Sequence, residues 1–205
     1  MTLFKTTIAT IMILMVAESA HAVLIFTDRT AWNAAAGTST TETFDNTIVD
    51  ADSIVLDNGI VSTALPSLLT FGLNNVNSRT VGAYTGRIGS LTGNHPPAIR
   101  WDLPSGINAW FADFGALNTN GLVVRGNWDG TGVVTLNIAA IIGANGGFGI
   151  IGNAAFTSFE WRTNDNSEFF TVDNFSSVAV PEPATLALLG IGLAGMGLAR
   201  RRKKV

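Results

Sequence analysis

Apolar and polar residues alternate in short runs along most of the chain, and this pattern predicts a β-rich domain. From residue 23 to about residue 178, the apolar runs are short and are separated by Gly, Asn, Asp and Pro. Such spacing is typical of antiparallel β-sandwiches whose strands are joined by tight turns. The runs that we expect to form strands are 24–26, 40–44, 54–56, 60–63, 67–71, 98–103, 109–114, 122–127, 133–138, 148–151, 156–162 and 169–175.

One segment departs from this pattern and predicts a short helix over residues 28–36. Asp28 is a suitable N-cap, alanines fill the following turn, and Gly37 is a typical residue to end a helix. Farther along, the polar stretch 128–132 separates two β-rich runs, so we expect a hairpin over 122–138. The glycine-rich stretch 143–152 predicts a link with little side chain to pack.

Together these elements predict a mainly β fold. We expect an antiparallel β-sandwich of jelly-roll type with one short N-terminal helix, and a barrel is the second choice.

The N-terminus has the features of a signal peptide. Lys5 supplies a positive charge, residues 8–16 form a short apolar core, and Ala20 and Ala22 fit the small-residue rule for cleavage. We expect residues 1–22 to be removed by cleavage after Ala22. The alternative is an uncleaved anchor, for which the apolar run is too short.

The C-terminus predicts a second membrane segment. Residues 184–199 are apolar and uncharged, and their 16 residues fall just short of the roughly 17–25 that cross a bilayer comfortably. Five cations follow and should hold this end on the cytoplasmic side, with the domain outside. These cations are Arg200, Arg201, Arg202, Lys203 and Lys204.

Three residues before this segment give it a more specific meaning. Pro181, Glu182 and Pro183, followed by the Gly-rich span and the basic tail, resemble the PEP-CTERM sorting signal of Gram-negative bacteria over residues 180–205. The resemblance implies export through the secretion translocon and cleavage near Pro-Glu-Pro by an exosortase, a membrane protease. It also implies delivery to the cell surface or the extracellular matrix. A plain single-span anchor is the alternative.

The chain is therefore divided into three parts. Residues 1–22 are the signal peptide, 23–178 the exported β-sandwich domain, and 179–205 the sorting signal. The domain itself resembles the opening and closing segments of many exported PEP-CTERM proteins. The segments that carry this likeness are 26–29, 31–32, 41–45, 156–159 and 169–175. The likeness names no activity.

Charge and composition exclude several classes of function. The chain has no cysteine, which removes disulfides, thiolate metal sites and cysteine nucleophiles. Residues 23–180 carry six arginines and thirteen acids, a net charge of −7. A domain of this charge is not expected to bind nucleic acid.

No motif for catalysis or for a cofactor is found. His95 lies in a Gly-Asn-His-Pro-Pro turn without a nucleophile motif, and a solvated loop histidine is the simpler interpretation. Glycosidases need two carboxylates roughly 5–10 Å apart, and the sequence identifies no such pair. We therefore expect no enzymatic activity.

Two acidic residues suggest a metal. Asp45 and Asp173 each precede an asparagine where the first and last strands should end, and such oxygen ligands suit Ca²⁺. Capping of turns by the same side chains is the simpler explanation.

The tryptophans suggest one ligand edge. Trp32 should pack inward from the helix, and Trp101, Trp110 and Trp161 should lie in the core. Trp128 lies in a polar turn, so we expect it to be exposed, with Asn127 and Asp129 beside it to bind sugar hydroxyls.

The function predicted from the sequence is that of a structural or adhesive component of the cell surface or matrix, without catalysis. The alternative is a carbohydrate-binding module for the matrix polysaccharide. A polysaccharide hydrolase is a third candidate.

Overall fold

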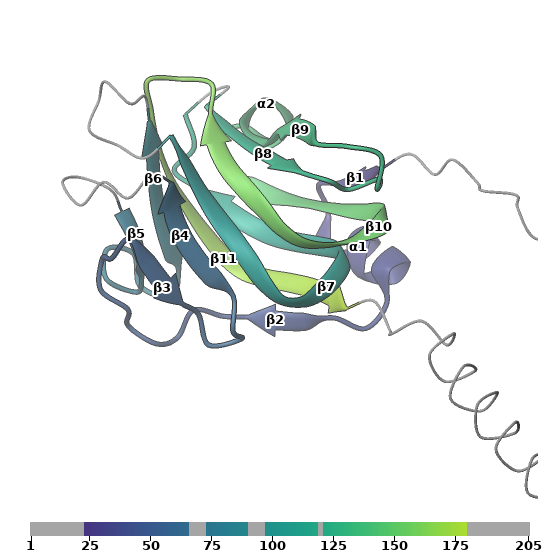
Figure 1. Cartoon of the computed structure of the whole chain (residues 1–205), viewed down its shortest axis with the longest axis horizontal. Coiled ribbons are helices and arrows are strands. Elements are labelled where there is room, and N and C mark those ends of the chain that lie inside the picture. Colours follow the sequence, from purple (N-terminus) through teal and green to yellow (C-terminus); the bar gives the residue numbers. More distant parts are fainter. Residues whose placement is uncertain (1–22, 66–72, 90–96, 119–120, 180–205) are drawn as a thin grey trace, which may run out of the picture.

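The computed structural model describes residues 23–65, 73–89, 97–118 and 121–179, and most of them lie in β-strands (Figure 1). The elements are β1 (Leu24–Phe26), α1 (Arg29–Ala36), β2 (Thr40–Glu42), β3 (Ser53–Val55), β4 (Val61–Leu65), β5 (Leu73–Val76), β6 (Tyr84–Gly89), β7 (Ala98–Gly115), β8 (Leu122–Gly126), β9 (Val134–Asn137), α2 (Ile138–Ile142), β10 (Gly146–Thr163) and β11 (Ser167–Ala179).

Two strands of 18 residues, β7 and β10, organise the sheet. They pair with each other along most of their length, antiparallel, and the other strand pairs of the described residues are also antiparallel. The first part of β7, residues 98–102, pairs with β4, while residues 107–115 pair with β11. The register of β10 against β7 shifts between Ile151 and Ser158. Such β-bulges bend the strand that contains them.

This bend folds the sheet onto itself. Trp101, from the first part of β7, contacts Phe175 of β11 at 5.2 Å and Tyr84 of β6 at 5.1 Å between ring centroids. Strands that are distant in the sheet therefore face each other across the core, as the wrapped ribbon of Figure 1 shows.

The mainly β, antiparallel prediction is confirmed, with one difference from the expected sandwich. All eleven described strands belong to a single hydrogen-bonded sheet with the path β5-β6-β11-β7-β10-β8-β9, and not to two separate jelly-roll sheets. The single sheet results from the long strands β7 and β10, since each of them bends and covers both sides of the core.

The interior is dominated by aromatic rings. Trp101, Trp110, Trp128 and Trp161 are all fully buried in one large cluster. A smaller cluster lies on the opposite face of the sheet, where Trp32 of α1 packs on Phe111 with 5.8 Å between ring centroids. The indole nitrogen of Trp32 donates a 3.1 Å hydrogen bond to the Ile150 carbonyl, which fixes α1 on β10.

The local predictions with a capping or turn signal are confirmed. Helix α1 begins after Asp28, whose carboxylate accepts a 2.7 Å hydrogen bond from the Ala31 amide, and it ends at Gly37 with a φ of 83°. Strands β8 and β9 pair as the expected hairpin, with Val123 opposite Asn137. Trp32, Trp101, Trp110 and Trp161 lie in the interior as predicted.

Other predictions were wrong. Residues 98–103 and 109–114 belong to one strand, and so do 148–151 and 156–162, because the strands bend without breaking. The glycine-rich stretch is not a loose link: its second half begins β10, and α2 lies just before it. Strands β5 and β6 were not predicted. The expected strand 67–71 lies outside the described residues.

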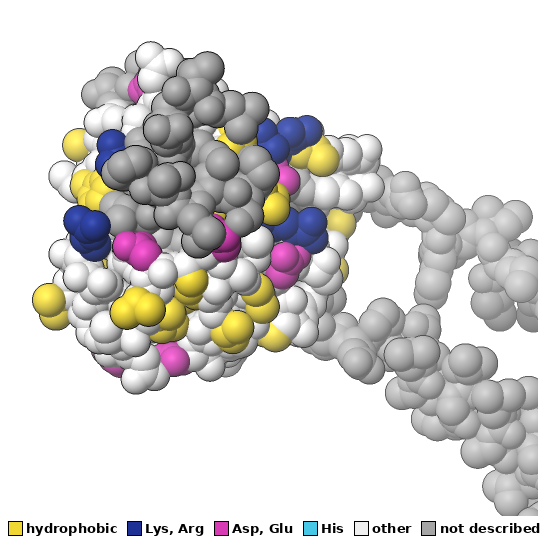
Figure 2. Space-filling model, turned by 60° about the vertical axis from the view of Figure 1, so that its left-hand side comes forward, with side chains coloured by type: hydrophobic (Ala, Val, Ile, Leu, Met, Phe, Trp, Pro, Cys, Tyr) yellow, Lys and Arg dark blue, Asp and Glu magenta, His cyan; other side chains and the backbone are white. Residues whose placement is uncertain are grey.

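The surface mixes charges and small apolar groups. On the face in Figure 2, acidic and basic side chains lie close together and hydrophobic side chains gather in small patches. The large hydrophobic residues that the described part exposes include Val49, Val81 and Val133.

Candidate functional site

The expected sugar-binding edge is not built as the sequence predicted, because Trp128 is fully buried. Its ring lies edge-on to Phe156, with 4.8 Å between ring centroids. The indole packs back over Gly126, where a Cβ atom would come within 2.5 Å of the ring. The missing side chain at Gly126 thus provides the space that the indole fills, and Trp128 offers no platform to a ligand.

Asn127 and Asp129, the polar neighbours, stabilise the turn. The Gly132 amide donates a hydrogen bond of 3.2 Å to the Asn127 side chain, and the Thr131 amide donates one of 2.9 Å to Asp129. The hydrogen bond from the Thr131 amide is the main cause that lowers the pKa of Asp129. These polar residues suggested that Trp128 is exposed, but they form the turn, and the Trp128 indole itself is buried.

A shallow groove lies beside Asn127 on the outer face of the sheet. It has a volume of about 260 Å³. Its lining residues come from β7, β8 and β10 and from the two ends of the β8–β9 turn: Arg100, Arg125, Gly126, Asn127, Val133, Ser158, Phe159 and Glu160. Of the three residues of the predicted edge, Asn127 alone lines this groove.

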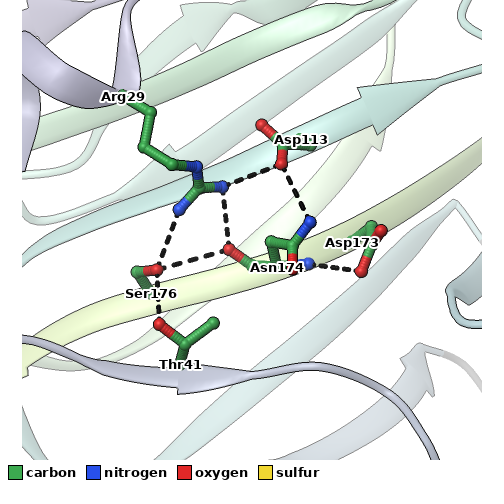
Figure 3. Close-up of polar contacts among 6 residues, drawn as sticks. All are labelled: Arg29, Thr41, Asp113, Asp173, Asn174 and Ser176. Atoms are coloured by element: carbon green, nitrogen blue, oxygen red, sulfur yellow. Dashed lines mark hydrogen bonds and ion pairs between the residues drawn. The ribbon is translucent and has the colours of Figure 1, made fainter.

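A second polar cluster joins α1 to the sheet around Arg29 (Figure 3). The Arg29 guanidinium donates hydrogen bonds of 2.9 Å to the Ser176 hydroxyl and to the Asn174 carbonyl. It also forms a 3.0 Å ion pair with Asp113 and lies 4.6 Å from the centre of the Phe111 ring. Thr41 of β2 completes the cluster through a 2.8 Å hydrogen bond with Ser176.

The expected calcium ligands lie at the border of this cluster. Burial raises the pKa of Asp173, and the negative charges of Asp113 and Asp45 raise it further, against the Arg29 charge. Asp45 follows β2, the second strand, and Asp173 lies in the middle of β11, so the prediction that they mark the ends of the first and last strands was wrong. In the part of the chain that the structure describes, no three acidic or histidine side chains are grouped to hold a metal. Calcium at Asp45 and Asp173 stays a prediction, and Arg29 supplies positive charge beside them.

Replacing Arg29 with alanine should lower the free energy of unfolding by about 2 kcal/mol, because several charge-assisted hydrogen bonds between α1, β7 and β11 are lost. Arg29→Lys keeps the charge but not the planar fork, so it should recover less than half of the loss. Urea unfolding of both variants measures this. If Arg29→Ala is as stable as the unchanged protein, the cluster does not hold α1 on the sheet.

Glu168 is a buried carboxyl at the other end of β11. Its side chain points inward, is fully buried, and accepts a 2.8 Å hydrogen bond from the Asn118 amide through Oε1. Its Oε2 has no hydrogen-bond partner among the described residues. Burial raises the pKa of Glu168 to about 7, and the nearby Asp165 adds to the effect, while the Asn118 amide opposes it.

This pKa makes stability fall as the pH rises. The folded state holds the Glu168 proton up to about pH 7, whereas the unfolded chain releases it near 4.5. The free energy of unfolding should therefore decrease by about 3 kcal/mol between these pH values and then level off. Glu168→Gln should remove this part of the pH dependence, measured by urea unfolding from pH 4.5 to 8. Parallel curves for the two proteins would show that Glu168 is ionised in the folded state throughout.

The remaining predicted site residues lie outside the described residues. They are Ala20 and Ala22 of the signal peptide, Pro181, Glu182 and Pro183 of the sorting motif, Arg200, Arg201, Arg202, Lys203 and Lys204 of the basic tail, and His95. The expected membrane helix 184–199 falls in the same undescribed part. Within the described ranges, no helix is long and apolar enough to cross a membrane.

The described part is a mainly β domain whose last strand, β11, ends at Ala179, directly before the Pro-Glu-Pro segment. Residues 179–203 match the family model of the PEP-CTERM protein-sorting motif, which confirms the resemblance in the sequence. No curated protein and no solved structure matches the chain. The motif implies an exported protein that an exosortase processes.

Proposed function

We propose that this protein is delivered to the cell surface or the extracellular matrix, where its β domain acts as a structural or adhesive component without catalysis. Before processing, the C-terminal helix would anchor it in the inner membrane with the domain outside the cytoplasm. Export and exosortase handling follow from the sorting motif. The motif does not determine the place of delivery or the role of the domain, and these two points are what we propose.

The position of the motif is the observation that carries this proposal. It starts at residue 179, the last residue of β11, so the sorting segment follows the folded domain without a linker. Cleavage near Pro181 would remove the tail and leave every described strand in place. A domain released in this way keeps its core and the complete network around Arg29, which supports a role after processing.

The roles of the acidic side chains favour a structural function. Glu42 is buried, and its two carboxylate oxygens accept 2.9 Å hydrogen bonds from the Phe44 and Asn58 amides. Asp50 accepts hydrogen bonds from the Asn74 amide and from the Asn75 side chain. These carboxylates hold loops in place, which explains their positions without a reaction.

Replacing Pro181, Glu182 and Pro183 together with alanine tests the sorting proposal. We expect the triple variant to keep its tail and to accumulate in the membrane fraction, because it loses the two prolines that favour an extended backbone before the expected membrane segment. Fractionation and mass spectrometry of native cells measure this, with Arg79→Gln on the surface of the domain as a control outside the matched residues 179–203. If the triple variant is processed and delivered like the unchanged chain, the motif does not direct sorting.

Glycan binding is the second candidate function, and the groove beside Asn127 favours it. The groove combines arginine, asparagine and serine side chains with the exposed apolar Val133, a mixture suited to a sugar with polar substituents. A glycan array probed with the full chain tests it. A hydrolase would instead require turnover that is lost when a single carboxylate is replaced.

A further inference from the structure

We propose that the groove lined by Arg100, Arg125, Asn127 and Ser158 binds a carboxylate-bearing sugar unit of an acidic extracellular polysaccharide, with Arg125 as its main ligand. This inference rests on glycan binding, the second candidate function above, and names the chemical class of the glycan. The proposed binding site lies on the outer face of the sheet and not, as the sequence predicted, at the turn around Trp128.

The strand register brings the polar side chains of the groove together. Arg100 of β7 lies opposite Glu160 of β10, and Glu160 lies opposite Arg125 of β8. The three side chains thus form one row across three neighbouring strands. In the next row, Ser158 lies opposite Asp102. Since adjacent strands are about 4.8 Å apart, a single sugar residue spans the distance from one strand to the next.

Arg125 is the cation in this row that is left for a ligand. Arg100 is paired with Asp102 at 2.6 Å, and Arg162 is paired with Glu160 at 2.7 Å, each along its own strand. Arg125 is exposed and forms no ion pair within the described residues. This small face therefore holds three of the six arginines of the domain against two acids.

The local excess of positive charge selects the ligand. The domain as a whole has a net charge of −7 and repels polyanions, so binding of an anion requires a specific contact. A guanidinium offers two parallel N–H donors, which match the two oxygens of a carboxylate. The amide nitrogen of Asn127 and the Ser158 hydroxyl add neutral donors for sugar hydroxyls, and the exposed Val133 provides apolar surface for the ring.

The position of the groove favours a glycan over an acidic peptide. Peptides that bind to sheets commonly add a strand at an edge, where unpaired backbone groups are available. The groove instead lies over β7, β8 and β10, which are paired on both sides, so only side chains are available. Because Trp128 is buried, recognition depends on charge and hydrogen bonds and not on stacking.

Binding of three probes of similar length to the full chain in neutral detergent tests the proposal. The probes are an alginate oligosaccharide, a dextran oligosaccharide and a polyglutamate peptide. We expect alginate to bind best, with an affinity that falls as salt is raised. Arg125→Gln should weaken alginate binding by about tenfold or more. Arg79→Gln removes the same charge from an exposed turn elsewhere and should change binding by less than about twofold.

Other binding results would contradict the carboxylate site, glycan binding, or both. Equal binding of dextran and alginate, unaffected by Arg125→Gln, would refute the carboxylate site but leave glycan binding in place. No binding of either glycan would refute both. Stronger binding of polyglutamate would show that the groove takes an acidic protein segment. Thermal unfolding of both variants confirms that they are folded, since Arg125 and Arg79 are exposed.

Discussion

Replacing Trp110 with alanine should lower the free energy of unfolding by about 3–5 kcal/mol, enough to unfold much of a marginally stable domain. Trp110 is fully buried at the centre of the aromatic core. Its ring stacks on Phe159 of β10 and on Phe175 of β11, with 5.6 Å and 6.0 Å between ring centroids, so it packs against both of these strands. Truncation would leave a cavity that two strands line and that rigid rings cannot fill.

Trp110→Phe is the matched control. The indole nitrogen of Trp110 has no hydrogen-bond partner among the described residues, so phenylalanine loses packing area but no hydrogen bond. We expect it to cost less than half as much as alanine, because most of the aromatic packing is kept. Urea unfolding measures both. If both variants lose the same small free energy of unfolding, the packing of Trp110 between β10 and β11 does not stabilise the domain.

Replacing Gly149 with alanine should lower the free energy of unfolding by about 3 kcal/mol through overpacking. In β10 this glycine lies directly under Phe111, and an added Cβ would be 2.5 Å from the Phe111 ring and 2.6 Å from the Trp110 carbonyl oxygen. The backbone oxygen is fixed in the sheet, so the strands must separate to make room.

Gly132→Ala is the control for this substitution. Gly132 lies in the β8–β9 turn, where an added Cβ meets no atom within 4 Å, and we expect a change within about 0.5 kcal/mol. Thermal and urea unfolding compare the two variants. If Gly149→Ala is as stable as Gly132→Ala, then β10 does not lie as close to Phe111 as described.

The elements that the sequence predicted well are those with a signal inside their own residues. Asp28 and Gly37 define both ends of α1, and the polar turn at 129–132 defines the β8–β9 hairpin. The long strands were divided in the prediction because Pro104 and Gly106 in β7 indicate a break. The structure bends there instead, since residues on both sides of the bend remain paired with β10.

The candidate site was harder to predict, because it depends on contacts between distant segments. Burial of Trp128 requires the space above Gly126 and the rings of Phe156 and Phe159, which its polar neighbours do not indicate. The row of Arg100, Glu160 and Arg125 depends on the register of three strands. Register is set by tertiary packing, so the sequence alone does not reveal it.

Three of the segments in which we expect the domain to resemble other exported proteins lie close together in the fold. Residues 26–29, 41–45 and 169–175 meet at the network around Arg29, where the first helix is fixed to the last strand (Figure 3), whereas residues 156–159 do not contribute to this network. Asn174 in this network has a φ of 49°, which a small polar side chain tolerates best.

The central claim is that the tail is a sorting signal and that the domain functions without it. The mass of the mature protein from native cells and their medium tests this most directly. We expect a chain that starts at Val23 and ends near Pro181, with all described strands present. A mass that includes residues 184–205 would show a permanently anchored protein and would contradict processing by an exosortase.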